Sequence, residues 1–144
     1  MTKSERCCEV PAFEIIRTHT FYFYAMLKVY AYSGCSTCKN ALKWLKGRGI
    51  AFEEVAIRET PPSVGELKAM LAGQGGELRR LFNVSGMDYR SLGLKDTLPG
   101  MSVEEALGLL AGNGNLVKRP FAIDVKKGVF LVGFKEGEWE GALH

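Results

Sequence analysis

Histidine is almost absent from this sequence of 144 residues, which contains only His19 and His144. Hydrolases that activate a serine or a cysteine commonly use a neighbouring imidazole as general base. His144 is the final residue and His19 precedes the first clear strand pattern. We therefore do not expect histidine-assisted catalysis.

Long apolar runs are also missing. A membrane-spanning helix needs about 20 consecutive apolar residues, whereas the best candidate, Phe21 to Ala31, is short and contains Lys28. A secretion signal needs a basic region followed by an apolar stretch. Acidic residues stand there instead, namely Glu5, Glu9 and Glu14. The sequence predicts a cytoplasmic protein with no membrane partner.

The charge is not strongly of one sign. The 19 Lys and Arg residues exceed the 16 Asp and Glu residues by three, which gives a net charge of +3. Nucleic-acid-binding domains usually carry dense basic patches, so we expect no direct nucleic-acid partner. The apolar fraction of 47% and the length suit one soluble domain with a real core.

Cysteine is scarce, but two of the four cysteines, Cys35 and Cys38, form a C-x-x-C pair within AYSGCSTCKN. Such a pair is a redox centre, half of a metal site or two small buried side chains. A zinc site needs a second spaced pair, whereas Cys7 and Cys8 are adjacent. We expect no metal site. In a reducing compartment the pair is more often catalytic or metal-binding than structural.

The chain changes character at Met26. Residues 1–25 show no sustained period, so we expect an N-terminal extension that is loosely ordered or an artefact of the start codon. MLKVYAY, which begins at Met26, alternates and predicts a strand. A helix is predicted next, ending near Gly47 and Gly49, with an apolar face formed by Cys38, Ala41, Leu42 and Leu45.

The remaining segments complete an α/β pattern over residues 26–144. IAFEEVAI predicts a second strand, FAIDVKKGVFLVGF a hairpin and KEGEWEGAL a short final helix. Two capping boxes, Ser63 with Glu66 and Ser102 with Glu105, predict helices in an insert at about 61–115. A βαβ unit joined to a C-terminal hairpin predicts a four-stranded mixed sheet covered by helices.

The C-x-x-C pair falls at the turn from the first strand into the first helix. Free backbone N–H groups and the helix dipole favour an anion there, and such positions lower a thiol's pKa. We therefore expect a thiolate at Cys35, with Cys38 one turn further on able to attack an adduct at Cys35. Ser36 and Thr37 are small enough to keep the turn open, and Gly34 lets a substrate approach the backbone.

From Met26 onward the chain resembles the ArsC/Spx family, the arsenate reductase-like proteins with a thioredoxin-like fold and an inserted helical subdomain. The resemblance is carried by YSGCSTCKNALKWL, PPSVGELK, YRSLGL and LVKRPF, in this order. It implies that Cys35 is the nucleophile and that Arg119 holds an oxyanion. It also implies that Pro120 is the proline, usually cis, that faces the nucleophile.

Two positions depart from the reductases of this family. Glutathione- and glutaredoxin-linked members carry further arginines where this chain has Asn83 and an apolar residue near Val132. Arg79, Arg80 and Arg90 are nearby in the sequence and are candidates to replace them. We expect substrate contacts from Gly34, Ser36, Thr37, Asn83 and Pro120.

These features predict a thiol-dependent reductase with no bound cofactor. Its substrate is a small oxyanion or an oxidised thiol, and glutathione, glutaredoxin or thioredoxin is the expected electron donor. Cys38, glutathione or a partner thiol resolves the adduct at Cys35, and resolution by Cys38 gives a redox-active disulfide between Cys35 and Cys38. The alternative is a redox-sensing transcriptional regulator of the Spx type that binds RNA polymerase. A third interpretation is a catalytically silent scaffold with an unshifted Cys35.

Overall fold

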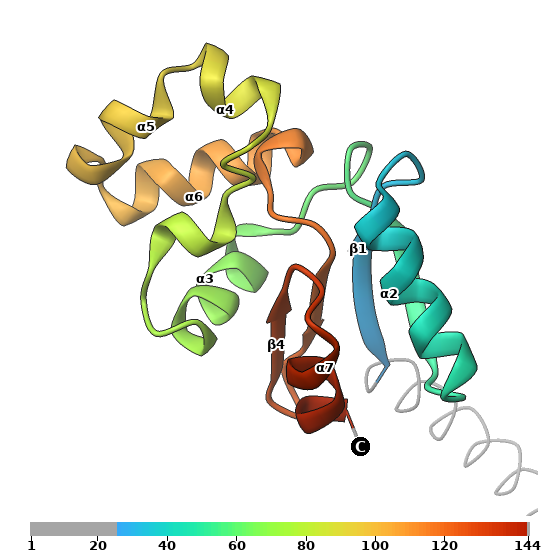
Figure 1. The fold of residues 1–144 in the computed structure, drawn as a ribbon. Helices are drawn as coiled ribbons and strands as arrows, with labels where there is room; N and C mark the ends of the chain where they lie inside the picture. The colour runs from blue at the N-terminus through green and yellow to red at the C-terminus, as the bar shows by residue number, and fades with distance from the viewer. Residues whose placement is uncertain (1–25, 144) are drawn as a thin grey trace, which may run out of the picture.

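The computed structural model describes residues 26–143, in which a four-stranded sheet lies at the centre (Figure 1). The strands are β1 (Leu27–Ala31), β2 (Phe52–Ala56), β3 (Phe121–Asp124) and β4 (Val129–Val132). The sheet has the order β2-β1-β3-β4; β1 and β2 are parallel, and the other neighbours are antiparallel. The predicted mixed sheet is confirmed, whereas the predictions for residues 1–25 lie outside the described residues.

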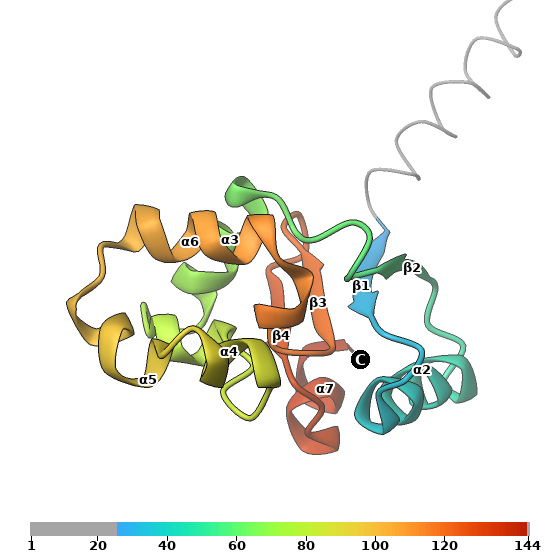
Figure 2. The ribbon, with the colours of Figure 1, turned by 90° about the horizontal axis from the view of Figure 1, so that it is seen from above.

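Helices occupy two places around this sheet. The helices α2 (Ser36–Gly47) and α7 (Glu136–Leu143) follow β1 and β4. Residues 64–116, which we call the helical region, join β2 to β3 and comprise α3 (Val64–Gly73), η1 (Leu78–Leu81), α4 (Met87–Ser91), α5 (Leu94–Thr97), η2 (Leu98–Gly100), α6 (Val103–Gly112) and η3 (Gly114–Leu116). Figures 1 and 2 show it on the opposite side of β1 and β4 from α2. Within residues 26–143, no helix has the length and apolar character to span a membrane.

The two faces of β1 bury different neighbours because successive side chains of a strand point to opposite faces. Leu27 and Val29 belong to a core with residues of α2 and α7. Tyr30 belongs to a second core with residues of the helical region, and it is only 3% exposed. Tyr30, on the polar side of the predicted alternation, is therefore buried, whereas the side chain of Lys28 on the same side stays 41% exposed.

An aromatic cluster fixes α7 against α2. The rings of Trp44 and Trp139 meet edge to face with centroids 6.2 Å apart, and Phe134 lies 5.2 Å from Trp139. The indole N–H of Trp139 donates to the carbonyl of Gly133 at 3.0 Å. Such aromatic pairs add stability beyond the area that they bury.

The carboxylate of Glu66 attaches α3 to the central strand. Ser63 and Glu66 form the predicted capping box at the start of α3. Glu66 also accepts a hydrogen bond of 2.7 Å from the hydroxyl of Tyr30 and lies 3.3 Å from the ammonium of Lys28, both on β1. Only half of the second predicted capping box is present: Ser102 accepts from the N–H of Glu105 at the start of α6, without the reciprocal bond that Glu66 makes in α3.

The chain entering β3 is held by the helical region. Phe82 and Val117 form an isolated antiparallel bridge, and the N–H of Lys118 donates to the carbonyl of Leu81 at 2.8 Å. Gly114 packs so tightly that a Cβ there would lie 1.9 Å from the carbonyl oxygen of Ile57. These contacts position the two residues that follow Lys118, which reach the candidate site.

Candidate functional site

The candidate site begins at the turn that links β1 to α2. The N–H of Cys35 donates to the carbonyl of Tyr32 at 3.0 Å, and Cys35 is the N-cap residue of α2 with extended backbone angles. Gly34 also has a packing role that the sequence did not show. A Cβ at Gly34 would lie 2.6 Å from the Tyr32 ring, so the glycine makes room for that ring.

The environment of Cys35 favours its thiolate. Burial alone would raise the pKa of Cys35, but the N–H and thiol of Cys38, the positive charge of Arg119 and the N–H of Thr37 outweigh it and lower the pKa. The Cys35 thiol makes no side-chain capping hydrogen bond. Amides at a helix start are well placed to stabilise an anion.

Cys38 has the opposite character. It lies one turn into α2, fully buried, while Cys35 is partly exposed, and both thiols are free. Burial, together with the hydrogen bond and negative charge of Cys35, raises the pKa of Cys38 to about 11, although the backbone of Tyr32 and the charge of Arg119 act the other way. The pair therefore combines a partly exposed thiol whose ionisation is favoured with a buried thiol that stays protonated and donates to it.

Arg119 and Pro120 approach this pair from β3. The Arg119–Pro120 peptide bond is cis. Tyr30 pairs with Phe121, so Pro120 stands beside the end of β1, at the edge of the sheet where the turn to Cys35 begins. The guanidinium of Arg119 lies over the Tyr32 ring, 5.2 Å from its centroid. A cation held on an aromatic face is restrained without being neutralised.

Arg58 is a second arginine on Tyr32, and no sequence motif indicated it. Its guanidinium lies 4.8 Å from the centroid of the same Tyr32 ring. Within residues 26–143, neither Arg58 nor Arg119 forms an ion pair with a carboxylate. One feature could have indicated that Arg58 lies near Tyr32. The strands β1 and β2 are parallel, so the residues that follow both strands lie at the same edge of the sheet.

The other predicted residues are not all at the thiol. Ser36 and Thr37 form the exposed first turn of α2 beside Cys35. Asn83 instead follows η1, where its N–H donates to Leu116 and its side-chain amide donates to Asn115. The contacts of Asn83 thus attach the helical region to the chain that leads into β3, and its role toward substrate stays a prediction.

A mixed sheet with a cysteine pair at the start of its first helix and a cis-proline opposite defines a thioredoxin-like thiol protein. The model of the ArsC family matches residues 30–142, and the chain belongs to that family. A solved structure of a protein related to the ArsC family from Bacteroides fragilis superposes with a TM-score of 0.76 at 42% identity, over 82% of this chain and 98% of the other. The thioredoxin-like fold is therefore confirmed.

Relatives of this chain have different names. It is 47% identical to the uncharacterized protein YusI of Bacillus subtilis (strain 168), over 79% of this chain and 95% of YusI. It is 30% identical to the regulatory protein MgsR of the same organism, over 78% and 86% of the two chains. It is 34% identical to an arsenate reductase of Rhizobium meliloti (strain 1021), over 66% of each. The family therefore contains both reductases and regulators.

Proposed function

We propose that this protein is a thiol-dependent reductase whose nucleophile is Cys35. The observation that carries the proposal is the pair of thiols at the start of α2, one turn apart and with pKa values shifted in opposite directions. Local amides and Arg119 lower the pKa of Cys35, whereas burial raises that of Cys38. A partly exposed thiol with a lowered pKa, next to a protonated thiol one turn away, is the arrangement that disulfide exchange needs.

The proposed reaction with a disulfide RS–SR′ balances as follows. The Cys35 thiolate attacks one sulfur, the S–S bond breaks, and R′S⁻ leaves with the bonding electrons, which forms a mixed disulfide Cys35–SR. Cys38 then gives up its proton and attacks the Cys35 sulfur, which releases RS⁻ and forms a Cys35–Cys38 disulfide. Two electrons from an external thiol reductant, such as glutathione or glutaredoxin, restore the dithiol.

Disulfides fit this site better than arsenate does. Only Arg119 matches the arginines that the resemblance assigns to oxyanion binding, since Asn83 and an apolar residue near Val132 stand at the other two places. Arg58, on the same tyrosine as Arg119, offers a second unpaired guanidinium. We therefore expect slow arsenate reduction at most, and faster reduction of disulfides.

The test is an NADPH-coupled assay with glutathione, glutathione reductase and glutaredoxin, in which arsenate and small disulfides are offered separately. With Cys35→Ser, the rate of NADPH oxidation should fall to that of the coupling enzymes alone, for every substrate that the wild type reduces. Cys38→Ser keeps the nucleophile but leaves the mixed disulfide for external thiols, so it should accumulate a mixed disulfide that mass spectrometry detects. Unchanged rates in Cys35→Ser would refute the proposal.

A regulatory function is the second candidate. The chain spans 86% of the regulatory protein MgsR but only 66% of the arsenate reductase. In that case the C-x-x-C pair would be a redox sensor, and the partner implied by the Spx resemblance is RNA polymerase. A pull-down of RNA polymerase with the reduced and the oxidised protein separates the candidates, because a pure reductase binds the polymerase in neither state.

A further inference from the structure

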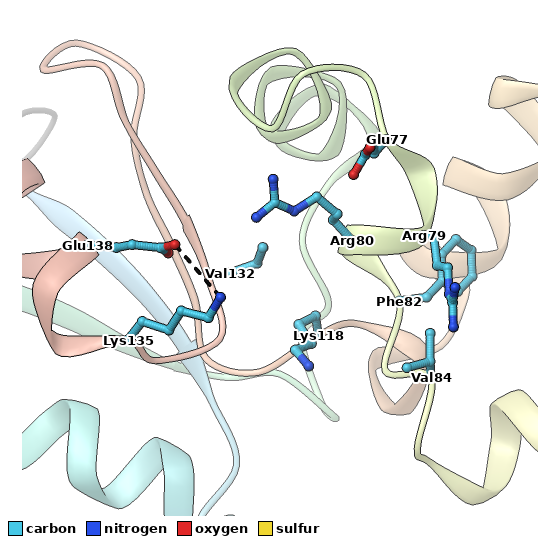
Figure 3. Close-up of a pocket in the computed structure, with 9 residues that line it drawn as sticks. All are labelled: Glu77, Arg79, Arg80, Phe82, Val84, Lys118, Val132, Lys135 and Glu138. Carbon is cyan, nitrogen blue, oxygen red and sulfur yellow. Dashed lines mark ion pairs between the residues drawn. The ribbon is translucent and has the colours of Figure 1, made fainter.

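A cationic pocket of about 330 Å³ lies between the helical region and the C-terminal hairpin and helix (Figure 3). Four basic side chains line it: Arg79 and Arg80 from η1, Lys118 from the chain entering β3 and Lys135 from the loop before α7. Phe82 and Val132 contribute apolar surface. The volume is at the small end of the range for ligand pockets, which starts at about 300 Å³.

The charges of this pocket are not balanced by its own residues. Two carboxylates, those of Glu77 and Glu138, also line it, so four positive side chains face two negative ones. Lys135 lies 3.9 Å from Glu138, and both are well exposed, so this pair is weak. Within residues 26–143, the other three cations form no ion pair. An anionic ligand would supply the missing charge.

The pocket and Cys35 lie at the same edge of the sheet. Phe121 pairs with Tyr30 of β1 on one side and with Val132 of β4 on the other. Because neighbouring strands are about 4.8 Å apart, the end of β4 is about 10 Å from the end of β1. The N–H of Gly133 also donates to the carbonyl of Pro120 at 2.9 Å. Residues 118–120 therefore border both places, because Lys118 lines the pocket and the charge of Arg119 acts on Cys35.

We propose that the cationic pocket binds the carboxylates of a small acidic disulfide while its sulfur meets Cys35. This inference rests on the proposed reductase function and names its substrate class. Guanidinium groups match carboxylates in shape and charge, and Figure 3 shows Arg80 directed into the space between η1 and β4. The apolar surface of Phe82 and Val132 suits the hydrocarbon part of such a molecule better than a bare oxyanion. Arg79 and Arg80 thus act where the family's arginines are missing.

Binding is tested first without any redox step. The probe is S-methylglutathione, which keeps both carboxylates but has a blocked sulfur, and the comparison is its diethyl ester, which lacks both carboxylate charges and keeps the ammonium group. Titration followed by amide NMR shifts should perturb residues 80, 118 and 132–135 with the acid, and much less with the ester. Arg80→Gln should weaken binding of the acid about tenfold. The matched control is Arg90→Gln, an exposed arginine of α4 outside the pocket, which should bind as the wild type does.

Kinetics then separate this inference from the proposed function. Arg80→Gln should raise KM for glutathione disulfide about tenfold with little change in kcat, and should leave the uncharged bis(2-hydroxyethyl) disulfide unaffected. If the wild type reduces neither disulfide, the proposed function fails, while the NMR titration still decides the pocket. If both disulfides are reduced with equal KM, or if S-methylglutathione does not bind there, the pocket proposal is wrong. Absence of S-methylglutathione binding is also the result expected if the pocket instead binds an acidic segment of another protein.

Discussion

At the scale of single residues, the site works through two thiols in unlike surroundings. Cys35 stands at the open end of a helix, where the amides and Arg119 act on its sulfur. Cys38 faces the core, and a charge on its sulfur would be both desolvated and close to the first. The first thiol to ionise is therefore the one that solvent can reach.

The ionisation of Cys35 can be measured from the rate of its alkylation by iodoacetamide against pH. The midpoint of this profile should lie below the ordinary thiol value of 9.0. Arg119→Gln should move the midpoint upward because it removes a positive charge, whereas Arg119→Lys should move it less. Cys38→Ala should also raise it, and Cys38→Ser, which keeps a donor, should raise it less. A wild-type midpoint at or above 9.0 would contradict the assignment.

The two arginines on Tyr32 should have separable effects. Arg119 lowers the pKa of Cys35, but Arg58 is not among the groups that do so. Arg58→Gln should therefore weaken substrate binding, seen as a KM raised a few-fold, while leaving the alkylation midpoint in place. The substitution Tyr32→Leu removes the ring that holds both guanidiniums, and should both raise KM and shift the midpoint upward. An unaltered KM in Arg58→Gln would exclude Arg58 from the site.

At the scale of elements, α3 is the helix most directly attached to the sheet by polar contacts. The carboxylate of Glu66 caps its own helix and accepts from Tyr30 of β1. Burial alone would raise the pKa of Glu66, but the hydrogen bonds from Tyr30 and Ser63 and the charge of Lys28 lower it. The stability that this carboxylate provides is therefore present above its ordinary pKa and is lost as the pH falls through the lowered value.

The substitution Glu66→Gln should reduce the free energy of unfolding by about 1–2 kcal/mol at neutral pH. It should also flatten the loss of stability below about pH 4.5, because no carboxylate remains to protonate there. Urea denaturation at a series of pH values measures both effects. Glu105→Gln, at the same position of α6, is the control, and its free energy of unfolding should fall at low pH as that of the wild type does. If Glu66→Gln loses stability at low pH as the wild type does, groups other than Glu66 cause that loss.

At the scale of the whole molecule, the sheet and the helical region meet through close backbone contacts. Gly114, at the end of the helical region, touches the backbone that leaves β2, and Val117 pairs with Phe82. A backbone carbonyl cannot rotate away as a flexible side chain can. The approach of the two parts therefore depends on the absence of a side chain at residue 114.

Gly114→Ala should destabilise the protein by about 3 kcal/mol or more, because its Cβ would overlap the carbonyl of Ile57. Gly108→Ala is the matched comparison. Gly108 lies inside α6 with open space where a Cβ would stand, so this change should stabilise the protein by about 0.5–1 kcal/mol. Thermal and urea unfolding of both variants check the pair, and equal effects of the two changes would contradict this explanation.

The sequence predicted local features well and distant ones poorly. The first strand, predicted over residues 26–32 and found at Leu27–Ala31, the cap at Ser63 and the hairpin around Lys126–Gly128 follow from short patterns and are confirmed. The contact of Arg58 with Tyr32 joins residues 26 positions apart, and a single chain gives no measure of that distance. Arg80 was predicted as a nearby candidate, but its place beside Val132 depends on how the helical region packs on the sheet.

The chain has two tryptophans, Trp44 and Trp139, and both lie in the aromatic cluster between α2 and α7. The core shared with the helical region contains tyrosines instead, Tyr30 and Tyr89. Tryptophan fluorescence, excited at a wavelength that tyrosine does not absorb, therefore reports on one face of the sheet only. The helical region could detach without dimming that signal, and comparison of the two chromophores during denaturation would show whether both faces come apart in a single cooperative event.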